Sequence, residues 1–134
     1  MLEAGLSMTS KINPDVIVAK LPQVPGNVDD KDRPSEWGGG GRRLLDQLIK
    51  QLPTLMAKDG MALIAHYDLN DFEQTEKLIQ SIDLRCETVY GWYVYESLDR
   101  ISKMPDSILE KHAKSIMFYG PDAIVRTRII KITF

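Results

Sequence analysis

The chain has 134 residues, the length of one domain, and its 43% hydrophobic and 27% charged residues are ordinary for a globular protein. The formal net charge of −2 argues against nonspecific binding to nucleic acid through overall charge. The only cysteine, Cys86, excludes an intrachain disulfide and a site of several cysteines, and we expect no metal site. No apolar run reaches the roughly 18–20 residues of a membrane span, and residues 1–11 lack the pattern of a secretion signal, so we expect a cytoplasmic protein without membrane partners.

The first predicted element is a buried strand over residues 15–19. Val16, Ile17 and Val18 follow one another without polar alternation, as in strands that are covered on both faces. A long loop over residues 21–41 follows, with three prolines and five glycines. Loops of this length in compact domains are usually functional or disordered, so the loop is a candidate site.

A helix and a second strand complete a predicted parallel β-α-β unit. Leucines, isoleucine and methionine at helical spacing predict a helix over residues 42–57, with a kink or a new short turn at Pro53. Asp59-Gly60 predicts a turn, and residues 61–67 predict a second buried strand. Such units place their chemistry at the carboxyl ends of the strands, where we expect the site.

The remaining elements are a helix, an aromatic strand, a helix and a final strand. Asn70, with Glu73 three residues later, predicts the start of the next helix. Residues 86–96 predict a strand whose aromatic side chains are buried on both faces. Residues 105–117 predict a helix that begins at a proline, and residues 124–134 predict the last strand. We expect the first three strands to be parallel and the last to be antiparallel, inserted beside the third.

Five segments stand out along this order of elements: Asp15-Val-Ile-Val18, Trp37-Gly-Gly-Gly-Gly41, Arg43-Leu-Leu-Asp46, Leu52-Pro-Thr-Leu-Met56 and Lys58-Asp-Gly-Met-Ala-Leu-Ile64. With these segments, the order resembles the C-terminal half of class I S-adenosylmethionine-dependent methyltransferases. The nearest subgroup contains the release-factor glutamine methyltransferases and the small-domain methyltransferases. The resemblance covers residues 14–96 and continues more loosely to the last strand, with residues 97–123 expected to be an insertion.

The resemblance implies an α/β fold of the Rossmann-like, three-layer αβα type. The sheet of that family has the strand order 3-2-1-4-5-7-6, so residues 1–134 would form one domain of about four strands in the order 4-5-7-6. The strand over residues 15–19 would then lie at a bare edge, which is short, apolar and uncharged. We therefore expect a homodimer or higher oligomer that covers this edge.

The resemblance also places a catalytic tetrapeptide at Lys20, Leu21, Pro22 and Gln23, of which only Pro22 matches the family. The family accepts hydrogen bonds from the target amine with an asparagine amide, whereas a lysine ammonium only donates. If catalysis survives, these residues and His66, at the end of the second strand, are the candidates. His66 could act as a base with Asp68 nearby, or could be a structural histidine.

Cofactor binding is not expected in the isolated chain. The family binds S-adenosylmethionine through a Gly-rich turn and an acidic residue on its first two strands, and the residues before Asp15 cannot form these. We therefore expect a truncated or degenerate methyltransferase-like domain that acts as an oligomeric or interaction module. One alternative is a methyltransferase subunit or fragment that uses S-adenosylmethionine when a complementary half is present.

A second alternative is a small-anion or nucleotide site at the start of the first helix. Backbone N–H groups at a helix N-terminus favour anions, and arginines would add charge. The candidate residues are Gly39, Gly40, Gly41, Arg42, Arg43 and Trp37. A flexible hinge before the helix explains the glycines without any ligand and is the favoured interpretation. An aromatic and basic face over Trp92, Tyr93, Tyr95, Arg126 and Arg128 could bind single-stranded nucleic acid, but its charge is thin and we expect no such partner.

Overall fold

The computed structural model describes residues 13–21, 41–104 and 106–134. The chain has a mixed α/β fold, as expected, with five strands in place of the predicted four. The described elements are β1 (Val16–Ala19), α2 (Arg43–Leu55), β2 (Met61–Tyr67), η2 (Asp68–Asn70), α3 (Phe72–Ser81), β3 (Arg85–Ser97), α4 (Leu98–Ser102), α5 (Asp106–Lys111), η3 (Ala113–Ser115), β4 (Ile116–Tyr119) and β5 (Asp122–Thr133).

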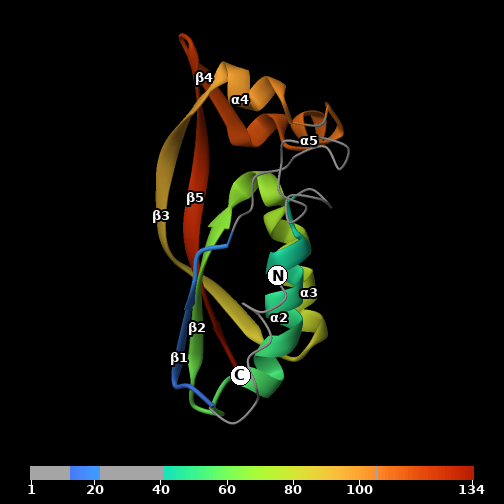
Figure 1. Ribbon diagram of the computed structural model, residues 1–134, viewed down its shortest axis with the longest axis vertical. Helices are drawn as coiled ribbons and strands as arrows, with labels where there is room; N and C mark the ends of the chain where they lie inside the picture. Colours follow the sequence, from blue (N-terminus) through green and yellow to red (C-terminus); the bar gives the residue numbers. More distant parts are fainter. Residues whose placement is uncertain (1–12, 22–40, 105) are drawn as a thin grey trace, which may run out of the picture.

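The sheet has the strand order β1-β2-β5-β3, and β4 also pairs with β5. β1 and β2 are parallel, and β5 runs antiparallel to each of its neighbours. The first part of β5 pairs with β4 and its later part pairs with β2, so β4 and β2 lie one beyond the other along the same side of β5 (Figure 1). Among the described strands, β1 and β3 lie at the two ends of this order.

Helices α2 and α3 cover one face of the sheet and bury the main core (Figure 1). The apolar stripe of α2 packs on alternate residues of the central strands, among them Ala62 and Ile64 of β2 and Ile130 and Ile132 of β5. α2 continues through Pro53 to Leu55, so no separate short turn begins at the proline. The proline lies in the last turn of the helix, which ends two residues later.

Gly60 allows the turn before β2 to approach the start of β1. A Cβ atom at this position would meet the carbonyl oxygens of Ala57 and Asp15 at 3.0 Å each. The N–H of the next residue, Met61, donates to the Asp15 oxygen at 2.8 Å. The turn therefore joins β1 to β2 and brings α2 back onto the sheet.

A second, smaller cluster lies on the opposite face of β5. Side chains alternate between the two faces of a strand, and Ala123 and Val125 lie an odd number of residues from Ile130 and Ile132. Their side chains therefore point to the face opposite to α2 and α3. They pack with Ile101 of α4 and other residues at the far end of the molecule. The described residues therefore form one continuous helical layer and a local cover on the other face, which does not establish the expected three-layer arrangement.

The prediction of one helix over residues 105–117 is wrong. The segment forms α5 and η3 and then enters the sheet as β4, preceded by α4. Ile116 is buried against β5, and Gly120, with φ of +59°, forms the turn between the two strands. An apolar and aromatic run followed by Gly-Pro is a hairpin signal, and pairing with β5 outweighs the helical spacing of the isoleucines.

Two local predictions also need correction. The N-cap of α3 is Asp71, not Asn70, because the Asp71 carboxylate accepts a hydrogen bond from the Gln74 N–H at 3.1 Å. The aromatic residues of β3 are not buried on both faces, since Tyr90, Tyr93 and Tyr95 are each at least 60% exposed. β3 is an outer strand, and most of its residues are exposed.

Candidate functional site: a pocket on the open face of the sheet

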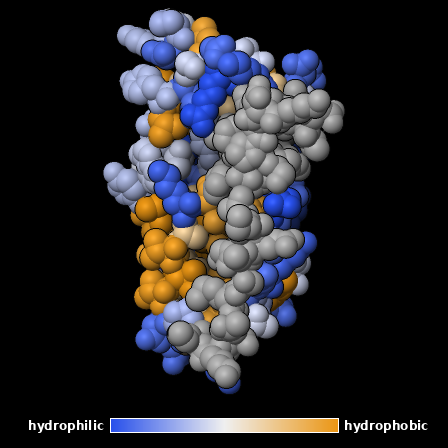
Figure 2. Space-filling view, in the orientation of Figure 1, coloured by the Kyte–Doolittle hydropathy of each residue, from blue (hydrophilic) through white to orange (hydrophobic). Residues whose placement is uncertain are grey.

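The face of the sheet opposite to α2 and α3, here called the open face, carries exposed apolar side chains of β1. Val16 is 49% exposed and Val18 is 77% exposed. Figure 2 shows hydrophobic side chains gathered along this side of the molecule. Met61 and Leu63 of β2 lie opposite these valines in the register and belong to the same face.

A pocket of about 290 Å³ lies on the open face, beside the carboxyl ends of β1 and β2. Its lining comes from three strands, from α4 and from the two residues that follow β1, and is mainly apolar. The lining residues are Lys20, Leu21, Ala65, Tyr67, Trp92, Val94, Glu96, Arg100 and Thr127. The pocket therefore lies where a parallel β-α-β unit is expected to hold its ligand.

The pocket arises from one row of side chains across three strands. Tyr67 of β2 and Trp92 of β3 are both paired with Thr127 of β5, which lies between them. Two large rings thus flank a small side chain and leave a hollow above it. The ring of Tyr90 stacks on Trp92 with 5.8 Å between the ring centroids, which supports the indole.

Charged groups gather at one end of this pocket. The Glu96 carboxylate accepts a hydrogen bond from the Tyr67 hydroxyl at 3.3 Å and forms an ion pair with Arg100 at 3.2 Å. Burial and the Glu96 charge raise the pKa of Tyr67, so this hydroxyl stays protonated and donates. Lys20 forms no ion pair within the part of the chain that the structure describes. One carboxylate and two cations give the lining a net charge of about +1.

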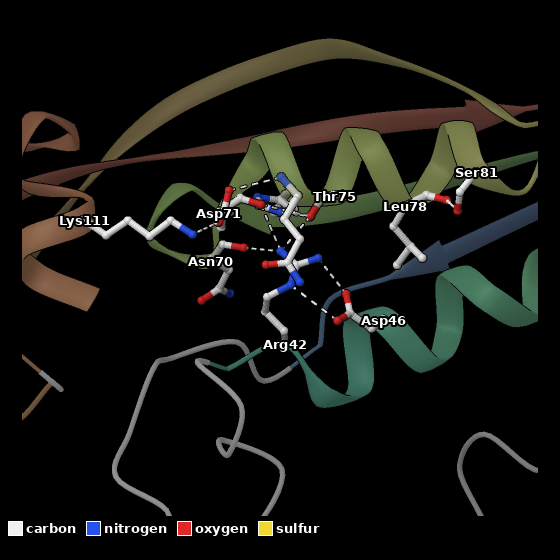
Figure 3. A network of polar contacts seen from close by, with 10 residues as sticks. Arg42, Asp46, Asn70, Asp71, Thr75, Leu78, Ser81 and Lys111 are labelled. Carbon is white, nitrogen blue, oxygen red and sulfur yellow. Dashed lines mark hydrogen bonds and ion pairs between the residues drawn. The ribbon is translucent and has the colours of Figure 1, made fainter. Parts of the chain in front are cut away.

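The other face holds a buried network around Arg42, which precedes α2 (Figure 3). Its guanidinium donates to the backbone oxygens of Asn70 and Asp71 and to the Thr75 hydroxyl, the last two at 2.9 Å. It also forms an ion pair with Asp46 at 2.6 Å. These acceptors occupy the guanidinium, so Arg42 serves as a tie between α2 and the β2–α3 connection.

His66 lies within this network and is fully buried. Its Nε2 atom is 2.8 Å from the Thr75 hydroxyl. Burial, followed by the charge of Arg42, lowers the pKa of His66 to about 4. Asp68, the expected partner, instead forms a two-point ion pair with Arg128, with both distances 2.7 Å.

The structure does not bring the predicted catalytic residues together. Lys20 lines the pocket on the open face, whereas His66 points to the helical face. The remaining predicted residues Pro22, Gln23, Trp37, Gly39 and Gly40 lie outside the described residues. Of the predicted anion site, Gly41 has φ of +75° and Arg43 is exposed.

Sequence reasoning missed most of the pocket. Tyr67, Thr127, Glu96 and Arg100 were not among the predicted site residues, and Trp92 was considered only with Tyr93, as part of a nucleic-acid face that the sequence did not favour. The register places these two aromatic residues on opposite faces of β3. Alternation along β3 was the only available signal, since the pairing of Thr127 with two rings depends on a register that the sequence does not reveal.

Within the described ranges, no helix combines the length and apolar character that crossing a membrane requires. In the same ranges, no group of three or more histidine, cysteine, aspartate or glutamate side chains is arranged to hold a metal ion.

Comparison with known proteins gives a fold and no family. No family model and no curated protein matches this sequence. Among solved structures, the chain is similar to the YcgJ protein of Bacillus subtilis, with a TM-score of 0.53 and 11% sequence identity. The match covers 98% of this chain and 73% of that chain. At this identity, the similarity concerns the fold alone.

Proposed function

We propose that this chain is a methyltransferase-like domain that does not bind a cofactor by itself and acts as an interaction module through its open face and the edge of β1. The observation that carries the proposal is the exposure of Val16 and Val18 on an outer strand. In this reading, β1, β2, β5 and β3 correspond to strands 4, 5, 7 and 6 of the methyltransferase sheet.

The connections of the strands support this correspondence. The β1-α2-β2 unit is parallel, α3 leads from β2 to β3, and the last strand lies between β2 and β3. Strands 1 and 2 of the family, which hold S-adenosylmethionine, have no counterpart among the described strands. Cofactor binding would accordingly require a complementary half on another chain.

The edge of β1 is better suited to pairing than the edge of β3. Within the described part of the chain, β1 pairs on one side only, and its apolar side chains are uncharged and exposed. β3 is interrupted by a register shift between Thr88 and Tyr90 and carries an ion pair between Glu87 and Lys131, at 3.2 Å. Bulges and charges of this kind protect an edge from pairing.

Calorimetric titration with S-adenosylmethionine, together with light scattering at micromolar protein concentration, tests the proposal. We expect no heat of binding from the isolated chain and a mass above that of the monomer. Tight binding would instead favour the alternative of a methyltransferase with its own cofactor site. A sharp monomer at all accessible concentrations would contradict the interaction module.

A second candidate is a methyltransferase subunit that uses S-adenosylmethionine once a partner completes it. The position of the pocket beside the carboxyl ends of β1 and β2 favours this candidate. The sequence also suggested an anion site at Gly39–Arg43. The Arg42 guanidinium is already bound within the protein, so this site would have one cation fewer than expected.

A further inference from the structure

We propose that the pocket on the open face binds a small planar ligand that carries one anionic group, such as an aromatic carboxylate or phosphate. The inference rests on the shape of the pocket, its aromatic walls and its local charge. The pocket lies on the same open face as the association proposed above, but the inference concerns a small-molecule site within one chain and has a test of its own.

The shape of the pocket selects a flat ring. Tyr67 and Trp92 rise on either side of Thr127, and Ala65 and Val94 complete an apolar floor. A volume of about 290 Å³ lies near the lower end of the range of small-molecule sites. Aromatic walls attract planar groups through offset stacking and through edge contacts. A single ring with a short substituent therefore fits better than a long chain.

The charge of the pocket selects an anion. The whole chain has a formal net charge of −2, whereas the lining has two cations and one carboxylate. Glu96 already accepts from Tyr67 and pairs with Arg100, so these three groups satisfy one another. Among the described residues, Lys20, which follows β1 directly, is the lining cation without an ion pair and can meet a ligand. A concave apolar site with one such cation concentrates anions against the overall charge of the protein.

Three matched probes separate charge from shape: phenylacetate, its neutral amide phenylacetamide and the cation 2-phenylethylamine. The sequence has two tryptophans, so in a Trp37→Phe background the fluorescence reports Trp92 alone. We expect a change of fluorescence with phenylacetate, weaker binding of the amide and the weakest binding of the amine. Phenyl phosphate, as a fourth probe, distinguishes carboxylate from phosphate recognition.

The variants test the residues that carry the inference. Lys20→Gln should weaken the binding of phenylacetate about fivefold, as expected for the loss of one exposed ion pair, and leave the binding of phenylacetamide unchanged. Lys50→Gln removes an equivalent exposed lysine from α2 and should change nothing. Thr127→Leu should fill the hollow and abolish binding of every probe, whereas Thr127→Ser should retain it. Unchanged thermal unfolding confirms that each variant is folded.

Two outcomes would overturn this inference. Equal affinity for the anion, the amide and the cation would show an apolar hollow without preference for charge. The absence of any fluorescence change with all four probes would show that the pocket takes no such ligand. Neither result changes what the proposed function predicts for light scattering or for calorimetry with S-adenosylmethionine. Failure of this site and failure of the proposed function can therefore be told apart.

Discussion

His66 shows how one buried side chain links the folding of this protein to pH. The imidazole is fully buried between the Thr75 hydroxyl and the ring of Phe72, whose centroid lies 5.3 Å away in an edge arrangement. Its Nδ1 atom has no hydrogen-bond partner among the described residues. Burial disfavours the charged ring, and charging it would add a second cation near Arg42, which explains why the pKa falls to about 4.

The first prediction is acid destabilisation through His66. In the folded state its pKa is about 4, while the unfolded value is 6.5, so the unfolded chain binds the proton first as the pH falls. The stabilisation is complete above pH 6.5 and is lost between pH 6.5 and 4, by about 3 kcal/mol in the free energy of unfolding. Urea unfolding across this range measures the loss.

The variants His66→Asn and His112→Asn separate the two histidines of the chain. His66→Asn removes the titrating group, so the loss of stability between pH 6.5 and 4 should become much smaller. His112 is less buried and its pKa is also lowered, so replacing it should change the pH dependence less. An unchanged slope in the His66 variant would contradict the assignment.

At the scale of elements, Arg42 holds the first turn of α2 against the connection between β2 and α3. The hydrogen bonds of Arg42 reach residues about thirty positions later in the chain, and the Arg42 side chain is only 7% exposed. A second ion pair, between Lys111 of α5 and Asp71, fastens the far helix to the same connection (Figure 3). The turn after β2 therefore positions three helices.

The second prediction concerns Arg42→Lys. A lysine keeps one charge but cannot reproduce a planar fork that reaches Asp46, Thr75 and two backbone oxygens. We expect a loss of about 2–4 kcal/mol in the free energy of unfolding, because buried acceptors are left without donors. Arg43→Lys, on the exposed neighbour, should cost less than about 0.5 kcal/mol. Urea unfolding of both variants makes the comparison, and equal losses would contradict the role of Arg42.

The elements that the sequence predicted well are those set by local patterns. The β1-α2-β2 unit follows from uninterrupted apolar runs, helical spacing and an Asp-Gly turn, which act within a few residues. The helix predicted over residues 105–117 failed, because Ile116 and Met117 are placed by pairing with β5 rather than by their spacing. The pocket could not be predicted either, because Thr127 meets Tyr67 and Trp92 only through the register of three strands.

At the scale of the whole molecule, the two faces of the sheet have different characters. The helical face is closed by α2 and α3. Its polar side chains are bound within the protein, Arg42 and His66 at the Thr75 hydroxyl and Arg128 at Asp68. The open face is apolar along β1, hollow at the pocket and covered at the far end by α4. The helical face therefore holds the main core of the domain, whereas the open face leaves apolar side chains exposed.

The third prediction tests, with the variant Val18→Lys, whether the chain associates through the open face of β1. The side chain is 77% exposed, so the lysine should be tolerated in the folded monomer, while a charge on an outer strand opposes edge pairing. We expect the apparent dissociation constant of the oligomer, measured by light scattering over a dilution series, to rise by at least about tenfold. Tyr95→Lys is the matched control, since Tyr95 is 70% exposed on the other outer strand, away from the open face. If Tyr95→Lys dissociates the oligomer and Val18→Lys does not, association takes place through β3, and the open face of β1 is not the docking surface.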